Sequence, residues 1–126
     1  MIGNRMRTIA LSAVTAIISF APPVIAGKSD GTWTMVAQTT RGHCGTIEIG
    51  LGISGGRIRS TSGSFAAYPI NMGGHVSASG QTSLRAVAGP RLANGTGRFS
   101  SVRGSGTWSG TGPSGHCSGV WSATRP

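Results

Sequence analysis

The sequence has 126 residues, which is enough for one small domain and too short for two. Only 10% of the residues are charged, glycine occupies 22 positions, and Lys and Arg outnumber Asp and Glu by 11 to 2. This composition excludes a coiled coil or a long helical bundle, which need Ala, Glu, Lys, Leu and Arg in quantity. Because Asp30 and Glu48 are the only carboxylate side chains, it also argues against chemistry that requires paired carboxylates.

The beginning of the chain has the pattern of an export signal. Two arginines precede an uncharged, mostly apolar run at positions 9–20, which is shorter than the roughly 20 residues that a membrane-spanning helix needs. Val24 and Ala26 fit the small-residue rule of cleavage sites. We therefore predict a signal peptide over residues 1–26 and one mature domain over residues 27–126, exported to the periplasm or the medium. The alternative is a short membrane anchor that is not cleaved.

In chain order, the remaining residues show the two-residue alternation of strands rather than a helical period. The alternating runs lie at positions 33–37, 47–53, 57–59, 84–88, 98–102, 106–109 and 119–123. Turn-forming residues separate them at positions 54–56, 72–74, 79–80, 94–95 and 111–113. We predict an all-β domain, an antiparallel meander of roughly eight short strands closed into a barrel, with a β-sandwich as the alternative. The low aliphatic content also resembles a disordered chain, but the strand pattern argues against disorder.

Cys44 and Cys117 are the only cysteines, and an even number in an exported protein most often indicates a disulfide. A bond between them would close a long loop and stabilise a thin core by roughly 4 kcal/mol in the chain-entropy model. Each Cys follows a His, so a metal site is the alternative. Adjacent residues on a strand point to opposite faces, however, and metal ligands usually stand two to four residues apart. We predict the disulfide, and neither a metal ion nor another cofactor.

Three Gly-x-Trp units contribute Trp33, Trp108 and Trp121. The first unit lies on the first predicted strand and the other two lie near the end of the chain, and the first and last strands of a closed meander are neighbours. We expect the three indoles to cluster at one end and plug the barrel. The alternative is that they line a ligand pocket.

Several of these residues carry a resemblance to known proteins. The Gly-Thr-Trp at 31–33 resembles the Gly-x-Trp on the first strand of lipocalin-like and streptavidin-like barrels. Together with 42–44, the patterns at 94–99, 104–108 and 117–123 are similar to a group of small, mostly uncharacterised exported proteins of alphaproteobacteria. The resemblance implies a bacterial periplasmic or secreted origin and no particular activity. A lipocalin usually has a longer chain and a helix before its end, so the short chain favours a filled barrel over an open one.

Residues 27–126 hold nine basic and two acidic side chains, a net charge of +7. Arg57 and Arg59 should project together from one face of a strand. Arg98 and Arg103 flank another strand, and their odd spacing would send them to opposite faces. Arginine binds phosphate and carboxylate groups with its forked geometry, so these four are candidate anion-binding residues. The alternative is a solvated basic surface that keeps the protein soluble.

The functional prediction is a non-catalytic, monomeric binding protein of the bacterial envelope. Its basic surface would contact anionic components such as lipopolysaccharide, lipid or polysaccharide. We predict no specific nucleic-acid binding, because the sequence offers few aromatic rings that could be exposed among the basic residues. We predict no enzyme, because only Asp30 and Glu48 could orient a catalytic base. One alternative is a carrier of a small hydrophobic ligand in the barrel. Another is an inhibitor of an acidic hydrolase that acts through residues 63–70.

Overall fold

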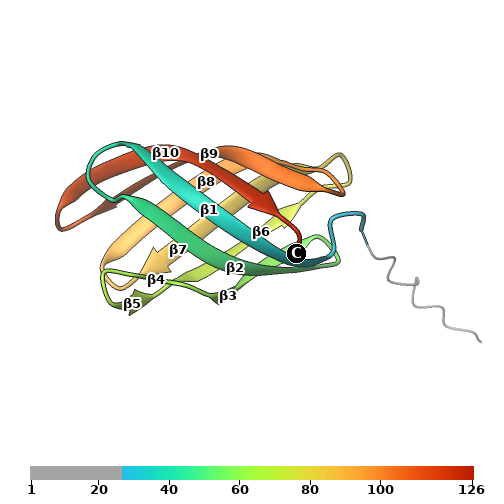
Figure 1. Cartoon of the computed structure of the whole chain (residues 1–126), viewed down its shortest axis with the longest axis horizontal. Helices are drawn as coiled ribbons and strands as arrows, with labels where there is room; N and C mark the ends of the chain where they lie inside the picture. Colours follow the sequence, from blue (N-terminus) through green and yellow to red (C-terminus); the bar gives the residue numbers. More distant parts are fainter. Residues whose placement is uncertain (1–26) are drawn as a thin grey trace, which may run out of the picture.

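Alternating apolar and polar side chains form the wall of a closed antiparallel barrel in residues 27–126, the part of the chain that the computed structural model describes (Figure 1). Eight strands close the ring in the order β1-β10-β9-β8-β7-β6-β3-β2, while β4 and β5 form a separate hairpin. The strands are β1 (Gly31–Arg41), β2 (Thr46–Ser54), β3 (Arg57–Ser62), β4 (Ser64–Phe65), β5 (Tyr68–Pro69), β6 (Asn71–Val76), β7 (Gln81–Ala88), β8 (Arg91–Phe99), β9 (Arg103–Gly112) and β10 (Gly115–Thr124).

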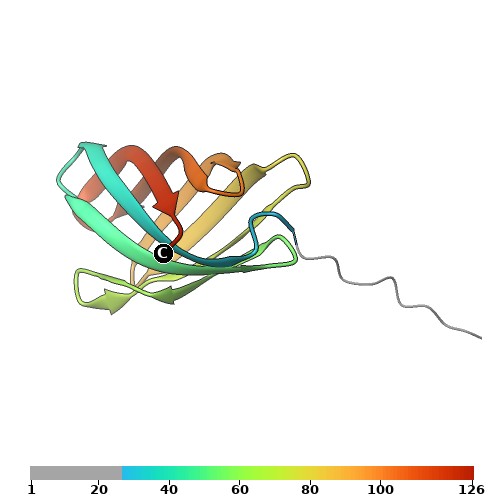
Figure 2. The same ribbon diagram turned by 45° about the vertical axis from the view of Figure 1, so that its right-hand side comes forward.

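The predicted all-β barrel is thus confirmed, and the sandwich alternative is wrong because the first and last strands pair. Met35 on β1 lies opposite Ile49 on β2 and opposite Ala123 on β10, so a single continuous ladder runs around the molecule. Figure 2 shows the oblique crossing of the strands that such closure requires. The predicted signal peptide lies outside the described residues, and within them no helix is long and apolar enough to cross a membrane.

Two of the predicted turns are wrong, and so is one predicted strand. Positions 72–74 lie inside β6, positions 94–95 lie inside β8, and the run predicted at 98–102 ends at Phe99, where the chain turns. The glycines at the first two places serve packing instead. A Cβ on Gly74 would overlap the backbone of Ser83, so a side chain there would push apart two paired strands.

Other strand glycines make room for aromatic rings in this narrow barrel. Gly97 on β8 and Gly106 on β9 are paired, and a Cβ on either would lie within 2.6 Å of the Trp121 indole. A Cβ on Gly104 would lie 2.8 Å from the Phe99 ring. Glycine weakens a strand, but here it allows large rings to rest directly on the backbone of the wall.

The turns divide into two ends of the barrel. We call one the closed end: it holds residues 27–30, the turns at 55–56, 77–80 and 100–102, and the end of β10. The other, the open end, holds the loop at 42–45, the segment at 63–70 and the turns at 89–90 and 113–114. In Figure 1 the closed end is on the right, where the C-terminus is marked.

Aromatic rings fill the barrel at the closed end. The Phe99 ring packs edge-on against Trp33 at 4.9 Å and lies 5.5 Å from the Trp121 ring, and all three side chains are buried. The Trp33 Nε1–H donates to the Ser29 carbonyl at 2.8 Å, which brings the N-terminal segment across the end of the barrel. The guanidinium of Arg125 lies over the Trp33 ring, 4.4 Å from its centre.

Hydrogen bonds then hold the N-terminal segment in place. The Arg125 guanidinium donates to the Asp30 carbonyl at 2.8 Å and to the Lys28 carbonyl at 2.6 Å. The Asp30 carboxylate accepts from the backbone N–H of Gly55 at 2.8 Å, and this bond lowers the pKa of Asp30 below its ordinary value of 3.8. Partial desolvation opposes that shift, and a second bond from Gly56 adds to it. Packing and charge-assisted hydrogen bonds therefore both hold the N-terminal segment at the closed end. A hollow of about 200 Å³ remains between this segment and the turns at 55–56 and 77–80.

Candidate functional site

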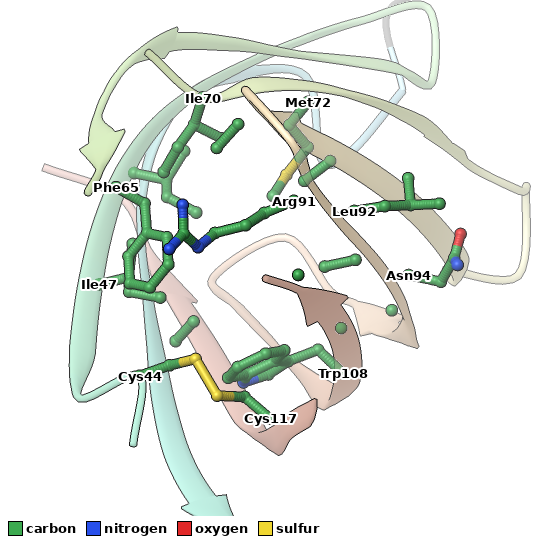
Figure 3. A pocket seen from close by; sticks show the side chains of 18 of the residues that line it. Cys44, Ile47, Phe65, Ile70, Met72, Arg91, Leu92, Asn94, Trp108 and Cys117 are labelled. Carbon is green, nitrogen blue, oxygen red and sulfur yellow. A yellow bond between two sulfur atoms is a disulfide. The ribbon is translucent and has the colours of Figure 1, made fainter. Parts of the chain in front are cut away.

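An apolar cavity occupies the barrel at the open end (Figure 3). Its volume is about 110 Å³, close to the roughly 150 Å³ of an engineered apolar cavity that binds benzene. Its walls come from strands all around the ring, with Met35, Ile49, Met72 and Leu84 among the side chains that line it. The barrel is therefore not filled to its end, unlike the filled barrel that the short chain favours.

The cavity exists because small residues occupy the inward-facing positions near this end. Inward positions at the end of β7 carry Ala86 and Ala88, and those at the start of β8 carry Ala93 and Gly95. On β9 the corresponding position is Gly110. The same strands carry or face Phe99 and Trp121 nearer the closed end, so the hollow begins where the large rings stop.

The predicted disulfide is confirmed and lies at this cavity. Cys44 in the loop at 42–45 is bonded to Cys117 on β10, with their Cα atoms 6.2 Å apart, and both residues line the pocket. A Cβ on Gly42 would lie 2.9 Å from the Cys117 sulfur, so the loop passes close over β10. Both sulfurs are used in the bond, and residues 27–126 contain no group of three His, Cys, Asp or Glu side chains placed to hold a metal ion.

The structure separates the three tryptophans that we expected to form one plug. Trp33 and Trp121 both pack against Phe99 in the core, whereas Trp108 is half-buried on β9 and belongs to neither of these ring pairs. Trp108 and Trp121 both line the cavity, and Trp33 does not. The Trp108 Nε1–H donates to the Gln38 carbonyl at 3.3 Å. The hairpin of β9 and β10 accounts for this split, because Trp108 is five residues from the turn at 113–114 and Trp121 is seven residues past it, so the two indoles stand at different heights.

Sequence reasoning missed Arg91, which begins β8. It has the same parity as Ala93, Gly95 and Phe99, so its side chain faces the interior. Figure 3 shows it extending toward Phe65, and the guanidinium carbon lies 5.2 Å from the centre of that ring. The parity was visible in the sequence, but the wrong turn at 94–95 broke the run that would have revealed it.

The segment at 63–70, a candidate inhibitory segment from the sequence, is a short hairpin. Ser64 pairs with Pro69 and Phe65 with Tyr68, around a tip whose two alanines have positive φ angles of 52° and 72°. Phe65 faces the cavity, and the half-exposed Tyr68 ring packs over Gly89 in the turn between β7 and β8. The hairpin therefore lies at the mouth of the cavity.

The predicted anion-binding arginines lie on the outside of the barrel. Arg57 and Arg59 are both exposed on β3, and Arg59 is paired with Gly73, which is paired in turn with Arg85. Two arginines thus face each other across a strand with no side chain between them. None of the four predicted arginines lines the cavity.

The expectation that Arg98 and Arg103 face opposite sides is wrong. Both are exposed on the outer surface, because the chain turns at 100–102 and Arg98 pairs with Ser105 on the returning strand. Residues 103 and 105 share a face of β9, so the turn restores the parity that a single straight strand would have broken. Arg98 also donates to the Ser79 carbonyl at 3.1 Å.

Comparison of the chain with models of protein families, with curated proteins and with solved structures gives no match. The eight-stranded antiparallel barrel agrees with the architecture implied by the Gly-x-Trp resemblance. The likeness to small exported proteins of alphaproteobacteria stays a prediction.

Proposed function

We propose that this protein is a non-catalytic carrier that binds a small apolar molecule inside its barrel. The observation that carries the proposal is the open apolar cavity of about 110 Å³. Ligand sites are typically concave, mostly apolar and equipped with few polar groups, and an eight-stranded barrel is just wide enough to hold one small ligand. By comparison with the benzene-binding cavity, the volume suits one aromatic ring or a short acyl chain.

The surroundings of the cavity favour a preformed site. The disulfide ties one side of the mouth to β10, and the closed end is packed by rings beneath it. A ligand that enters a preformed site does not have to offset the cost of ordering it. The proposal includes export to an oxidising compartment, where such disulfides persist.

A pair of adjacent substitutions on β7 tests the proposal. Ala86→Phe places a ring in the cavity, whereas Val87→Phe places the same ring on the outer face of the same strand. We expect neutral 1-octanol to bind the native protein and Val87→Phe with equal affinity, measured by calorimetry and tryptophan fluorescence. Ala86→Phe should weaken binding at least about tenfold, because it displaces two or more methylene groups at about 0.8 kcal/mol each.

Circular dichroism and a thermal melt of both variants establish that they are folded. A lack of saturable binding of 1-octanol and toluene to the native protein would contradict the proposal, as would equal binding by a folded Ala86→Phe variant.

A second candidate function is contact of the outer basic surface with an anionic envelope component, as the sequence predicts. The position of Arg59 and Arg85 on either side of Gly73 favours it. Their strands lie two spacings of about 4.8 Å apart, and two long side chains can reach one anionic group over a glycine. The two carboxylates lie elsewhere: Asp30 at the closed end and Glu48 on β2.

Vesicles of phosphatidylglycerol test this second candidate. We expect the native protein to co-sediment with them at about 0.1 M salt and to be released at about 1 M, where charges are screened within about 3 Å. The double variant Arg59→Gln/Arg85→Gln should bind more weakly than Lys28→Gln/Arg41→Gln, which removes the same net charge from two exposed residues outside the candidate anion-binding set. Equal weakening in the two double variants would indicate a general charge effect and refute this specific contact.

A further inference from the structure

We infer that the ligand of the cavity carries a carboxylate head group and that Arg91 is the side chain that binds it; this inference rests on the proposed function. Arg91 is one of the residues that line the cavity, and the lining is otherwise formed by uncharged residues. A single cation at the mouth of an apolar cavity matches a molecule with an apolar body and one anionic end.

The position of Arg91 places its charge across the entrance. It starts β8 directly after the turn at 89–90, and β8 stands opposite β2 in the eight-stranded ring. Its guanidinium reaches Phe65, whose strand β4 contacts β2 on that far side. Figure 3 shows the side chain spanning the space between the two walls, above the interior of the cavity.

The guanidinium has donors to offer. Its five N–H donors make no hydrogen bond to protein and no ion pair within residues 27–126. The guanidinium makes a cation–π contact with the Phe65 ring. The nearest comparison is Arg125, which also lies over a ring but donates to two backbone carbonyls. Neither carboxylate of the domain can serve Arg91, because Asp30 is bound at the closed end and Glu48 faces outward from β2.

The charge balance favours a carboxylate over a phosphate. One guanidinium neutralises one negative charge and accepts a carboxylate in a two-bond, side-by-side geometry. A phosphate monoester carries close to two negative charges, and no second Lys or Arg among the described residues lines the cavity. Burying the remaining charge beside apolar walls would be costly.

A matched pair of ligands and a matched pair of variants test the inference. Octanoate and 1-octanol have the same chain length and differ in the head group. Arg91→Met removes the cavity guanidinium, whereas Arg41→Met removes an exposed arginine at the end of β1 that does not line the cavity. At pH 7, we expect Arg91→Met to weaken octanoate binding by roughly tenfold to hundredfold, the range of a charged hydrogen bond. Binding of 1-octanol to Arg91→Met and of octanoate to Arg41→Met should stay within about twofold of the native protein.

The outcomes separate this inference from the proposed function. If Arg91→Met leaves octanoate affinity unchanged while 1-octanol binds, the cavity is a ligand site but the carboxylate assignment is wrong. If Arg41→Met weakens octanoate binding as much as Arg91→Met does, the effect is long-range electrostatics and the assignment is also overturned. If neither ligand binds the native protein, the proposed function itself fails. Recovery of most octanoate affinity in Arg91→Lys would support the need for a cation at this position.

Discussion

At the closed end the guanidinium of Arg125 lies 4.4 Å from the Trp33 ring, and at the open end the guanidinium of Arg91 lies 5.2 Å from the Phe65 ring. The first donates hydrogen bonds to two carbonyls and locks the N-terminal segment over a packed core. The second has no such partner and stands over a cavity. An arginine over an aromatic ring therefore stabilises the fold at the closed end, whereas at the open end the arginine keeps its hydrogen-bond donors available for a ligand.

The glycines of β8 and β9 repeat this difference. Gly97 and Gly106, toward the closed end, are filled over by the Trp121 ring. Gly95 and Gly110, toward the open end, border empty space instead. A glycine in the wall of a small barrel thus makes room, and whether the room is filled depends on the rings that other strands supply.

Removal of the disulfide should have the largest effect on stability, because the open end lacks a packed aromatic core. We expect the Cys44→Ala/Cys117→Ala variant to lose about 4 kcal/mol of unfolding free energy, since the bond closes a loop with a sequence separation of 73 residues. Urea unfolding with and without reductant measures it. A loss below about 1 kcal/mol would show that strand pairing alone holds this end, and would weaken the contrast between the two ends.

The two arginines offer the most direct comparison. Arg125→Met should cost about 2 kcal/mol, because it removes two charge-assisted hydrogen bonds and a cation–π contact. Arg91→Met should cost no more than about 1 kcal/mol, because the guanidinium loses its cation–π contact with Phe65 but no hydrogen bond to protein in the described chain. Denaturant unfolding of both variants measures the difference. Equal losses would mean that Arg91 is a structural residue and that the contrast between the ends is false.

The smallest expected effect is a pH dependence at the closed end. Hydrogen bonding to Gly55 lowers the pKa of Asp30 in the folded protein, so its contribution to stability is complete above its ordinary pKa of 3.8 and is lost as the pH falls through the lower folded value. The difference in unfolding free energy between the native protein and Asp30→Asn should therefore shrink below about pH 4. Unfolding curves from pH 3 to pH 7 test it, and a difference independent of pH would exclude Asp30 as the titrating group.

The sequence patterns gave correct predictions where the neighbouring residues of a segment all indicate the same structure. The alternation at 33–37 and 47–53 matches the buried positions of β1 and β2, because their inward residues are large and apolar and their outward residues are not. The patterns failed at two of the places where glycine was taken as a turn signal, whereas the turns predicted at 54–56 and 79–80 are present. At 72–74 and 94–95 the chain continues as a strand. The glycines there are required by the close approach of a neighbouring strand and not by a turn of the local backbone.

The candidate site was only partly predictable for the same reason. Trp108 was identified, but its height in the barrel depends on the register of β9 against β10. Arg91 was overlooked, since the inward direction of a charged residue follows only once β8 is known to be one unbroken strand. The outward direction of Arg57 and Arg59 followed directly from their spacing on a single strand.

The sequence by itself determined that this domain is all-β and held by a disulfide, because two-residue periodicity, turn chemistry and cysteine count can be read from nearby residues and composition. It favoured a barrel over a sandwich, and the pairing of β1 with β10 decided between them. Only the tertiary structure decided which end is filled and which is hollow. That choice depends on which strands place rings at one height and small residues at another, and the register of all the paired strands around the ring sets those heights together.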